Sequence, residues 1–210
     1  MQRGCVKNWP HSEDVYLGSC NNVCILLKVM PVITKVKIHQ KKGDKMSDTK
    51  NNLKEAFAGE SQANRKYLAF ASKADSEGFT KIAMLFRAAA EAETVHAHAH
   101  LKALNGIGET SENLKEAISG ETDEFKNMYP NMIETAVSEQ EKVAERSFRF
   151  ANEVEKIHAE LYQKALDNID HPQDVHCYYV CSVCGNTVEN EAPEVCPICR
   201  AKAKAFTKVE

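Results

Sequence analysis

The chain has 210 residues, 43% apolar and 27% charged, a composition typical of a folded globular protein rather than a disordered or fibrous one. Residues 1–45 hold eight Lys and Arg against three Asp and Glu, whereas residues 46–210 hold 19 against 27. This acidic main part argues against nucleic acid as a partner. No run approaches the ~18 uninterrupted apolar residues of a membrane-spanning helix, which excludes a transmembrane segment.

The eight cysteines are confined to the two ends of the chain. None lies between residues 25 and 176, which argues against a disulfide framework spread along the sequence. Five fall within residues 177–210, and four of these form two Cys-x-x-Cys pairs. The pattern indicates a metal site in a reducing compartment, and we therefore expect a cytoplasmic protein.

Residues 1–45 differ from the rest of the sequence. Their apolar run VCILLKVMPVI is interrupted by Lys28 and Pro31 and leads into lysines, unlike the unbroken apolar stretch of a secretory signal. We expect this segment to be an upstream extension of the reading frame or a poorly ordered tail, with Met46 as the candidate start.

Long segments rich in Ala, Glu, Lys and Leu follow, and they predict four helices within residues 46–170. Short connections between long helices favour antiparallel neighbours, and hence a four-helix bundle. Pro130 predicts a kink inside the third helix. The expected helices run from Ser47 or Asp48 to about Ser76, from about Thr80 to Leu104, from Ser111, and from about Glu139 to Ile169.

The predicted bundle contains an internal repeat. NLKEAFAGE, which begins at Asn52, returns as NLKEAISGE from Asn113, and FRAAAEAETVHA, which begins at Phe86, returns as FRFANEVEKIHA from Phe148. The two copies of the later block lie one position further apart than the two copies of the earlier block. The second repeat therefore contains one additional residue between its two blocks. Two copies of a helical hairpin packed face to face would form a bundle with an approximate two-fold axis.

The repeat separates six candidate metal ligands from the many other glutamates. The first and third helices each offer one Glu, and the second and fourth each offer Glu-x-x-His, whose members share one helix face. This is the ligand set of di-iron carboxylate bundles, and its oxygen-rich donors suit iron or manganese better than zinc. A single such Glu would be interpreted as solvated surface, but six recurring together favour a site. The six are Glu60, Glu93, His96, Glu121, Glu155 and His158.

Glu124 breaks the symmetry of this set. It lies three residues after Glu121, whereas the equivalent position of the first repeat is Ala63. An extra carboxylate on one side gives one metal a choice of ligand, so Glu124 is the candidate mobile ligand. His98 and His100 have no histidine counterparts in the repeat, and we expect them to be solvated.

Residues 177–210 are too few to close an apolar core alone and are expected to fold around a metal. Cys181 and Cys184 form one Cys-x-x-Cys knuckle, and Cys196 and Cys199 form the other. Four thiolates at this spacing indicate a tetrahedral site, for zinc or for a single iron. Fusion to a candidate di-iron bundle favours iron, which would carry one electron. Residues 171–176 are the expected linker.

Residues 46–210 resemble the rubrerythrin family in the motifs AGES near Glu60, ETVH from Glu93, SGETDE ending at Glu124, MYP at 128–130, EKIH from Glu155 and a C-terminal CxxCG…CPxC. The resemblance implies a mainly α fold, in which a ferritin-like four-helix bundle carries a small rubredoxin-like β module. It also implies a non-haem di-iron peroxidase for oxidative-stress defence, which reduces hydrogen peroxide with electrons from rubredoxin or an NAD(P)H-dependent flavoprotein through the C-terminal iron.

The same resemblance assigns roles to individual residues. Glu60, Glu93, Glu121, Glu124, Glu155 and His158 would bind the two irons, and His96 would replace Glu124 on one iron upon reduction. Tyr67 and Tyr129 match tyrosines that form hydrogen bonds near the site, although either could equally be an ordinary core residue. A homodimer or higher homo-oligomer is implied.

One alternative belongs to a different class of protein. A ferritin-like ferroxidase or iron-handling protein with a structural zinc ribbon would have similar motifs. It predicts zinc in the four-cysteine site, larger assemblies and oxygen-driven iron oxidation without a reductant. The sequence leaves the electron donor, peroxide or oxygen as the main oxidant, and the assembly size open.

Overall fold

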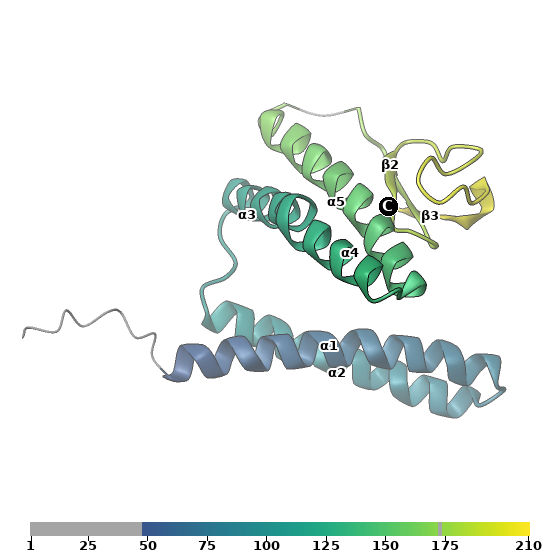
Figure 1. The fold of residues 1–210 in the computed structure, drawn as a ribbon. Helices are drawn as coiled ribbons and strands as arrows, with labels where there is room; N and C mark the ends of the chain where they lie inside the picture. Colours follow the sequence, from purple (N-terminus) through teal and green to yellow (C-terminus); the bar gives the residue numbers. More distant parts are fainter. Residues whose placement is uncertain (1–47, 172–173) are drawn as a thin grey trace, which may run out of the picture. The chain divides into compact units, whose positions relative to one another are not determined.

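The computed structural model describes residues 48–171 and 174–210 (Figure 1). The predictions made for residues 1–45, for Ser47 as a cap and for part of the linker lie outside these residues. Among the described residues, no helix combines the length and the apolar character needed to cross a membrane.

Two long helices form the first hairpin. Helix α1 (Asp48–Ser76) lies alongside α2 (Thr80–Ala103), and a turn containing Gly78 at φ 84° joins them (Figure 1). Glycine suits that turn because it adopts positive φ without a Cβ clash. Alanines at 71, 74 and 83 are buried between the helices, and small side chains at these positions allow the two backbones to approach closely.

The second hairpin is interrupted where the sequence predicts a kink. Helix α3 (Thr110–Asp123) passes into a π-helix, η1 (Glu124–Met128), and continues as α4 (Tyr129–Ser138); both α3 and α4 pack on α5 (Lys142–Asp167). Helix α1 ends at Ser76 and α4 ends at Ser138. The separation of these two equivalent positions equals the larger of the two repeat offsets, the one found for the second pair of blocks. The residue gained between the repeats therefore lies before Ser138, and the π-helix, which contains one extra residue per turn, accounts for it.

The connection between the hairpins is short and capped at both ends. Asn105 has φ 56°, and the backbone N–H of Gly106 donates to the carbonyl of Leu101 at 3.0 Å, closing the end of α2. At the other end, Glu109 and Glu112 form a capping box at the start of α3. The connecting residues are Leu104–Glu109.

The C-terminal module is a small antiparallel sheet in the order β2-β1-β3. Strand β1 (Tyr178–Cys181) pairs with β2 (Thr187–Glu189) and with β3 (Phe206–Val209), and a short 3-10 helix, η2 (Ala203–Ala205), precedes β3. Cys181 and Cys196 are among its most buried side chains. The core of the module is therefore built around sulfur atoms rather than around large apolar side chains.

Candidate metal centres

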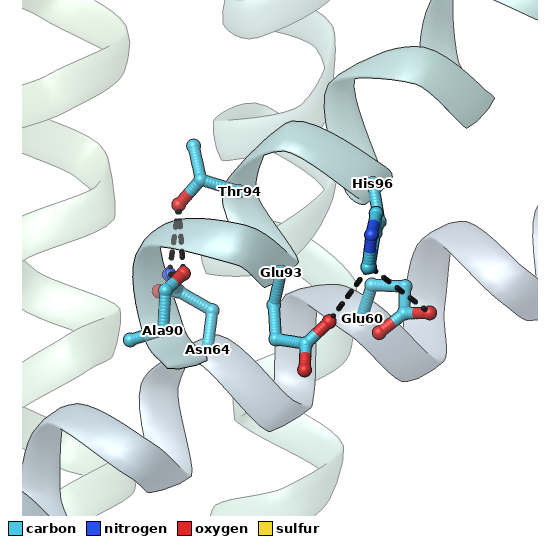
Figure 2. A network of polar contacts seen from close by, with 6 residues as sticks. All are labelled: Glu60, Asn64, Ala90, Glu93, Thr94 and His96. Atoms are coloured by element: carbon cyan, nitrogen blue, oxygen red, sulfur yellow. Dashed lines mark hydrogen bonds and ion pairs between the residues drawn. The ribbon is translucent and has the colours of Figure 1, made fainter. Parts of the chain in front are cut away.

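Three predicted ligands lie together on the first hairpin (Figure 2). Glu60 projects from α1, and Glu93 and His96 project from consecutive turns of α2. The Nδ1 atom of His96 lies 3.0 Å from Oε2 of Glu93 and 4.0 Å from Oε1 of Glu60. One ligand atom from each residue falls within 4.8 Å of the others, a spacing suited to one shared metal ion.

The second hairpin repeats this geometry with its own three ligands. The Nδ1 atom of His158 on α5 lies 2.7 Å from Oε2 of Glu155 and 3.8 Å from Oε1 of Glu121 on α3. The repeat in sequence is thus a repeat in space. The two clusters differ in exposure, because the His96 side chain is 56% exposed and that of His158 only 26%.

One carboxylate in each cluster has a raised pKa. Burial, followed by the negative charges of Glu155 and Glu124, raises the pKa of Glu121 to about 7. A hydrogen bond with Glu93, followed by partial burial, raises the pKa of Glu60. A divalent cation would compensate the negative charge that burial and the neighbouring carboxylates disfavour, so the donor set fits a carboxylate-bound metal.

Glu124 and Tyr129 lie within electrostatic reach of the second cluster. Burial, then the charge of Glu155, raises the pKa of Glu124, which stands at the first position of the π-helix. Burial and the charges of Glu155 and Glu124 likewise raise the pKa of Tyr129. Tyr67 belongs to the first hairpin, where its ring centroid lies 6.2 Å from that of Phe86.

Two further residues lie near the clusters although the sequence analysis did not predict them as site residues. His100, expected to be solvated, is half-buried, and its charge lowers the pKa of Glu60. Its counterpart in the second repeat is Tyr162, whose pKa is raised by burial and by the charges of Glu121 and Glu155. Both lie one helical turn beyond the cluster histidine, at i+4, which is the signal that could have identified them. His98 is exposed, as expected.

The four knuckle cysteines converge in the C-terminal module. The Sγ atoms of Cys181 and Cys199 are 3.6 Å apart, as are those of Cys184 and Cys196. Sulfurs about 2.3 Å from a tetrahedral ion would be about 3.8 Å apart, so the group is already close to metal-binding geometry. Burial would raise the pKa of Cys196, but backbone N–H groups of Cys199 and Ile198 lower it to about 7, favouring the thiolate.

The module contacts the second hairpin beside a predicted metal ligand. The Nε2 atom of His158 lies 3.0 Å from the hydroxyl of Thr187 on β2, and Lys164 on α5 forms an ion pair with Glu189 of the same strand. Thr187 lies three residues after Cys184. The four-cysteine site and one carboxylate–histidine cluster are therefore joined through α5 and β2.

The six bundle ligands form two groups of three, each drawn from a single hairpin. The charged groups that shift the pKa of Glu60 all belong to the first hairpin, and those that shift the pKa of Glu121 all belong to the second. The convergence of all six on one centre therefore stays a prediction.

Comparison with known proteins identifies the helices and the module separately. Residues 51–166 match the family model described as Rubrerythrin, and residues 179–207 match the one described as Rubrerythrin, rubredoxin-like domain. The chain belongs to the rubrerythrin family. Its two hairpins correspond to the ferritin-like part, with a di-iron carboxylate type of site, and its four cysteines to the rubredoxin-like part.

Several curated members of the family align over most of their length. Rubrerythrin-2 of Clostridium acetobutylicum is 39% identical over 75% of this chain and 95% of its own. Rubrerythrin of Porphyromonas gingivalis is 35% identical over 79% and 92%, and nigerythrin of Nitratidesulfovibrio vulgaris is 35% identical over 77% and 87%. A solved structure of nigerythrin in a mixed-valent state aligns at 31% identity and a TM-score of 0.46, covering 86% of this chain and 98% of that one.

Proposed function

We propose that this protein reduces hydrogen peroxide to water at a centre holding two iron ions, with electrons delivered through an iron in the four-cysteine site. Each turnover consumes one peroxide, two protons and two electrons and yields two water molecules. Bound iron would supply the redox chemistry at both sites. The observation that carries the proposal is the hydrogen bond of Thr187 to His158, which joins the two kinds of metal site in one chain.

The residues of the two hairpins would hold the metals in distinct roles. Six of them occupy matching positions of the repeat, whereas Glu124 has only Ala63 opposite it. Glu124 would act as the mobile ligand, exchanging with His96 upon reduction. Tyr67 and Tyr129 would support the site through hydrogen bonds. The proposed ligands are Glu60, Glu93, Glu121, Glu124, Glu155, His158 and, after reduction, His96.

The mobile-ligand role has a direct test. In a Glu124→Ala variant, we expect the spectra of the oxidised and reduced centres to differ less than in the unmodified protein, because no carboxylate remains to exchange. Glu91→Ala is the matched control, since Glu91 is an exposed glutamate of α2 outside both clusters. Unchanged redox behaviour in the Glu124→Ala variant would rule the role out.

The electrons would come from rubredoxin or from an NAD(P)H-dependent flavoprotein, and the protein would work as a cytoplasmic homodimer or higher homo-oligomer. The four knuckle cysteines would bind a metal only as reduced thiolates, which agrees with a reducing compartment. Peroxide turnover should therefore depend on an intact four-cysteine site when a protein donor supplies the electrons.

The experiment measures anaerobic peroxide consumption with NADPH and a reductase–rubredoxin pair. Cys181→Ser should lose most of this turnover, whereas Cys177→Ser, outside both knuckles, should retain it. Undiminished turnover in Cys181→Ser would contradict the proposed electron route.

Metal analysis and a visible spectrum distinguish the proposed peroxidase from the ferroxidase alternative. A ferric tetrathiolate site is red, whereas a zinc site is colourless.

A further inference from the structure

We propose that Thr187 of the C-terminal module is a positioning residue, which holds the ring of His158 in the orientation that binds a metal ion. Thr187 lies on β2, and His158 lies on α5 of the second hairpin. This role rests on the proposed function, because it concerns a ligand of the carboxylate–histidine site. A residue of the four-cysteine module would thus set the metal affinity of a different site.

The hydroxyl of Thr187 has a single proton, and a neighbouring carbonyl determines where it points. The hydroxyl lies 3.1 Å from the carbonyl oxygen of Gly185, which can only accept a hydrogen bond. It also lies 3.0 Å from Nε2 of His158. Because its proton is donated to Gly185, the hydroxyl accepts a hydrogen bond from Nε2–H of the histidine. Thr187 therefore selects the tautomer of His158 that has its proton on Nε2.

This tautomer leaves Nδ1 as the nitrogen that can bind a metal ion. Nδ1 of His158 lies 2.7 Å from Oε2 of Glu155 and 3.8 Å from Oε1 of Glu121, inside the cluster of candidate ligands. A neutral imidazole binds a metal through the nitrogen that has no proton. A hydrogen-bond partner on the other nitrogen fixes the tautomer and the orientation of the ring. The hydroxyl of Thr187 is such a partner.

The first hairpin shows the equivalent histidine without this contact. Nδ1 of His96 lies 3.0 Å from Glu93, much as Nδ1 of His158 lies beside Glu155. Within residues 48–171 and 174–210, however, no hydrogen bond is formed by Nε2 of His96, and its ring is the more exposed of the two. The repeat therefore supplies the contact with the glutamate, and only the module supplies the contact with Nε2.

The four-cysteine cluster determines where Thr187 lies. The preceding residue, Asn186, is buried, and its side-chain amide donates to Sγ of Cys196 at 3.8 Å. The backbone N–H of Cys181 donates to the carbonyl of Asn186 at 2.9 Å, and that of Gly185 donates to the carbonyl of Cys181 at 2.8 Å. The residues immediately before Thr187 thus surround the sulfur atoms, so the hydroxyl reaches its position when the cluster is formed.

Contacts on both sides of the hydrogen bond hold the module against α5. Val154, a buried residue one turn before His158, lies so close to the loop that its Cγ1 would be 3.7 Å from a Cβ placed at Gly185. Further along the helix, Lys164 forms an ion pair with Glu189 of β2. In both segments the hydrogen bond lies between these two contacts, so β2 is held at the height of the histidine.

A hydrophobic cavity surrounds the same contact. His158 and Thr187 line a cavity of about 370 Å³ together with Leu161 of α5 and with Tyr178 and Val180 of β1. These neighbours offer the imidazole few other polar partners. Loss of the hydroxyl would therefore leave Nε2–H without its partner in the fold, and the ring would be free to rotate or to change tautomer.

The position of Thr187 predicts an energetic coupling between the two kinds of metal site. A module as small as residues 177–210 is expected to fold around its metal. Filling the four-cysteine site would then order β2, and with it the hydroxyl that holds His158. Because coupling between two binding sites is reciprocal, a metal at the carboxylate–histidine site would strengthen binding by the cysteines by the same factor.

Replacing the hydroxyl tests the positioning role. Thr187→Val keeps the shape of the side chain and should weaken anaerobic Co(II) binding at the carboxylate–histidine site by about tenfold. Thr187→Ser restores the hydroxyl and should bind Co(II) as the unmodified protein does. Thr207→Val is the matched control, because Thr207 is exposed and pairs with Val180 from the opposite side of β1 to Thr187.

The measurement separates the two sites by their preference for metals. One equivalent of Zn(II) is added first, because four thiolates bind zinc in preference to Co(II). Co(II) is then titrated without oxygen, and the weak visible absorption of the carboxylate–histidine site gives its affinity. In separate samples that receive one equivalent of Co(II) alone, intense cobalt–thiolate absorption confirms that the module is folded in each threonine variant.

A double-mutant cycle tests the coupling to the four-cysteine site. A variant with all four knuckle cysteines replaced by Ser, titrated without Zn(II), should bind Co(II) at the carboxylate–histidine site at least about tenfold more weakly, because Thr187 is no longer held in place. Adding Thr187→Val to this variant should cause no further loss. A further tenfold loss, or full affinity in the variant without cysteines, would overturn the coupling.

The threonine variants decide between the positioning role and the proposed function. Equal affinity in Thr187→Val and Thr187→Ser, with the module folded, would overturn the role of Thr187 and leave the proposed function intact. A loss in Thr207→Val as large as in Thr187→Val would overturn it as well, because the effect would not depend on the contact with His158. An unmodified protein that binds Co(II) only in the four-cysteine site would instead overturn the proposed function.

Discussion

The two helical hairpins share a repeated sequence, but they hold their ligands under different conditions. Each presents two glutamates and a histidine with nearly the same distances. His96 is more than half exposed, whereas His158 is mostly covered and bonded to Thr187. The repeat thus sets the identity of the candidate ligands, and contacts outside the repeat, such as that of Thr187, set how firmly their side chains are held.

The second hairpin also contains features that distinguish its cluster from the cluster of the first hairpin. The π-helix begins at Glu124, and a π-bulge inside a helix is frequent at functional sites. The first hairpin has an unbroken α1 and only Ala63 at the equivalent position. Two identical hairpins would present two equivalent clusters, so the π-helix that begins at Glu124 is the structural origin of the difference between them.

The largest expected difference between the hairpins concerns their histidines. His158→Ala should weaken Co(II) binding on the order of 100-fold, because it removes a positioned ligand together with its Thr187 contact. His96→Ala should weaken binding by about tenfold or less, because the His96 ring is exposed and Glu124 remains available to bind the same ion in its place. Glu153→Ala, an exposed position on α5, is the control.

Anaerobic titration of each variant, followed by absorption, gives the two affinities. If the two alanine variants lower the Co(II) affinity equally, the two hairpins are equivalent as metal sites. The difference between them is then only the exposure of their histidines. If His96→Ala has the larger effect, the comparison is reversed.

A second prediction concerns pH. The pKa of Glu121 is about 7 in the folded protein and near 4.5 when unfolded, so the folded state binds the proton more tightly. This stabilisation is fully present below about pH 4.5 and is lost as the pH rises through about 7. From these pKa values, the free energy of unfolding of the metal-free protein should fall by up to about 3 kcal/mol across that range.

Urea unfolding of the metal-free protein at several pH values measures this change, at a fixed protein concentration because assembly would shift stability. Glu121→Gln should remove most of the pH dependence, and Glu60→Gln should change it less. If the free energy of unfolding of Glu121→Gln changes with pH as steeply as that of the unmodified protein, other titrating groups cause the pH dependence.

Much of the fold was predictable from sequence because its signals are local. Asn105–Gly106 and Gly78 mark the ends and turns of helices, and the two knuckles mark the module. The fourth helix was expected from about Glu139 and begins at Lys142, because Glu139–Glu141 form a turn with Gln140 at φ 61°. Such a turn at a non-glycine residue leaves little trace in sequence.

The candidate site was predictable where the same residue type occupies equivalent positions in both copies of the repeat. Glu93 and Glu155 stand out among many glutamates only because they recur at the same spacing before a histidine. His100 and Tyr162 occupy equivalent positions with different side chains, so the repeat could not identify them. The contact of Thr187 with His158 joins two separate parts of the chain and has no local signal in the sequence.

The smallest of these predictions concerns Asn64, a buried polar residue whose counterpart in the second repeat is Phe125. Its side-chain amide donates to the carbonyl of Ala90 at 2.7 Å and to the hydroxyl of Thr94 at 2.9 Å (Figure 2). Asn64→Ala should lower the free energy of unfolding by about 1–2 kcal/mol, because both hydrogen bonds are lost. Thr94→Val, which removes one partner, should cost less.

The Asn64→Leu variant sharpens the comparison with the second hairpin. The Oδ1 atom of Asn64 is buried without a hydrogen-bond partner among the described residues, so an apolar residue of similar size removes an unfavourable contribution together with the two bonds. We expect Asn64→Leu to be closer to the unmodified protein than Asn64→Ala in urea unfolding. A Leu variant as unstable as the Ala variant would mean that the first hairpin needs this polar link, and that the two hairpins are packed by different means.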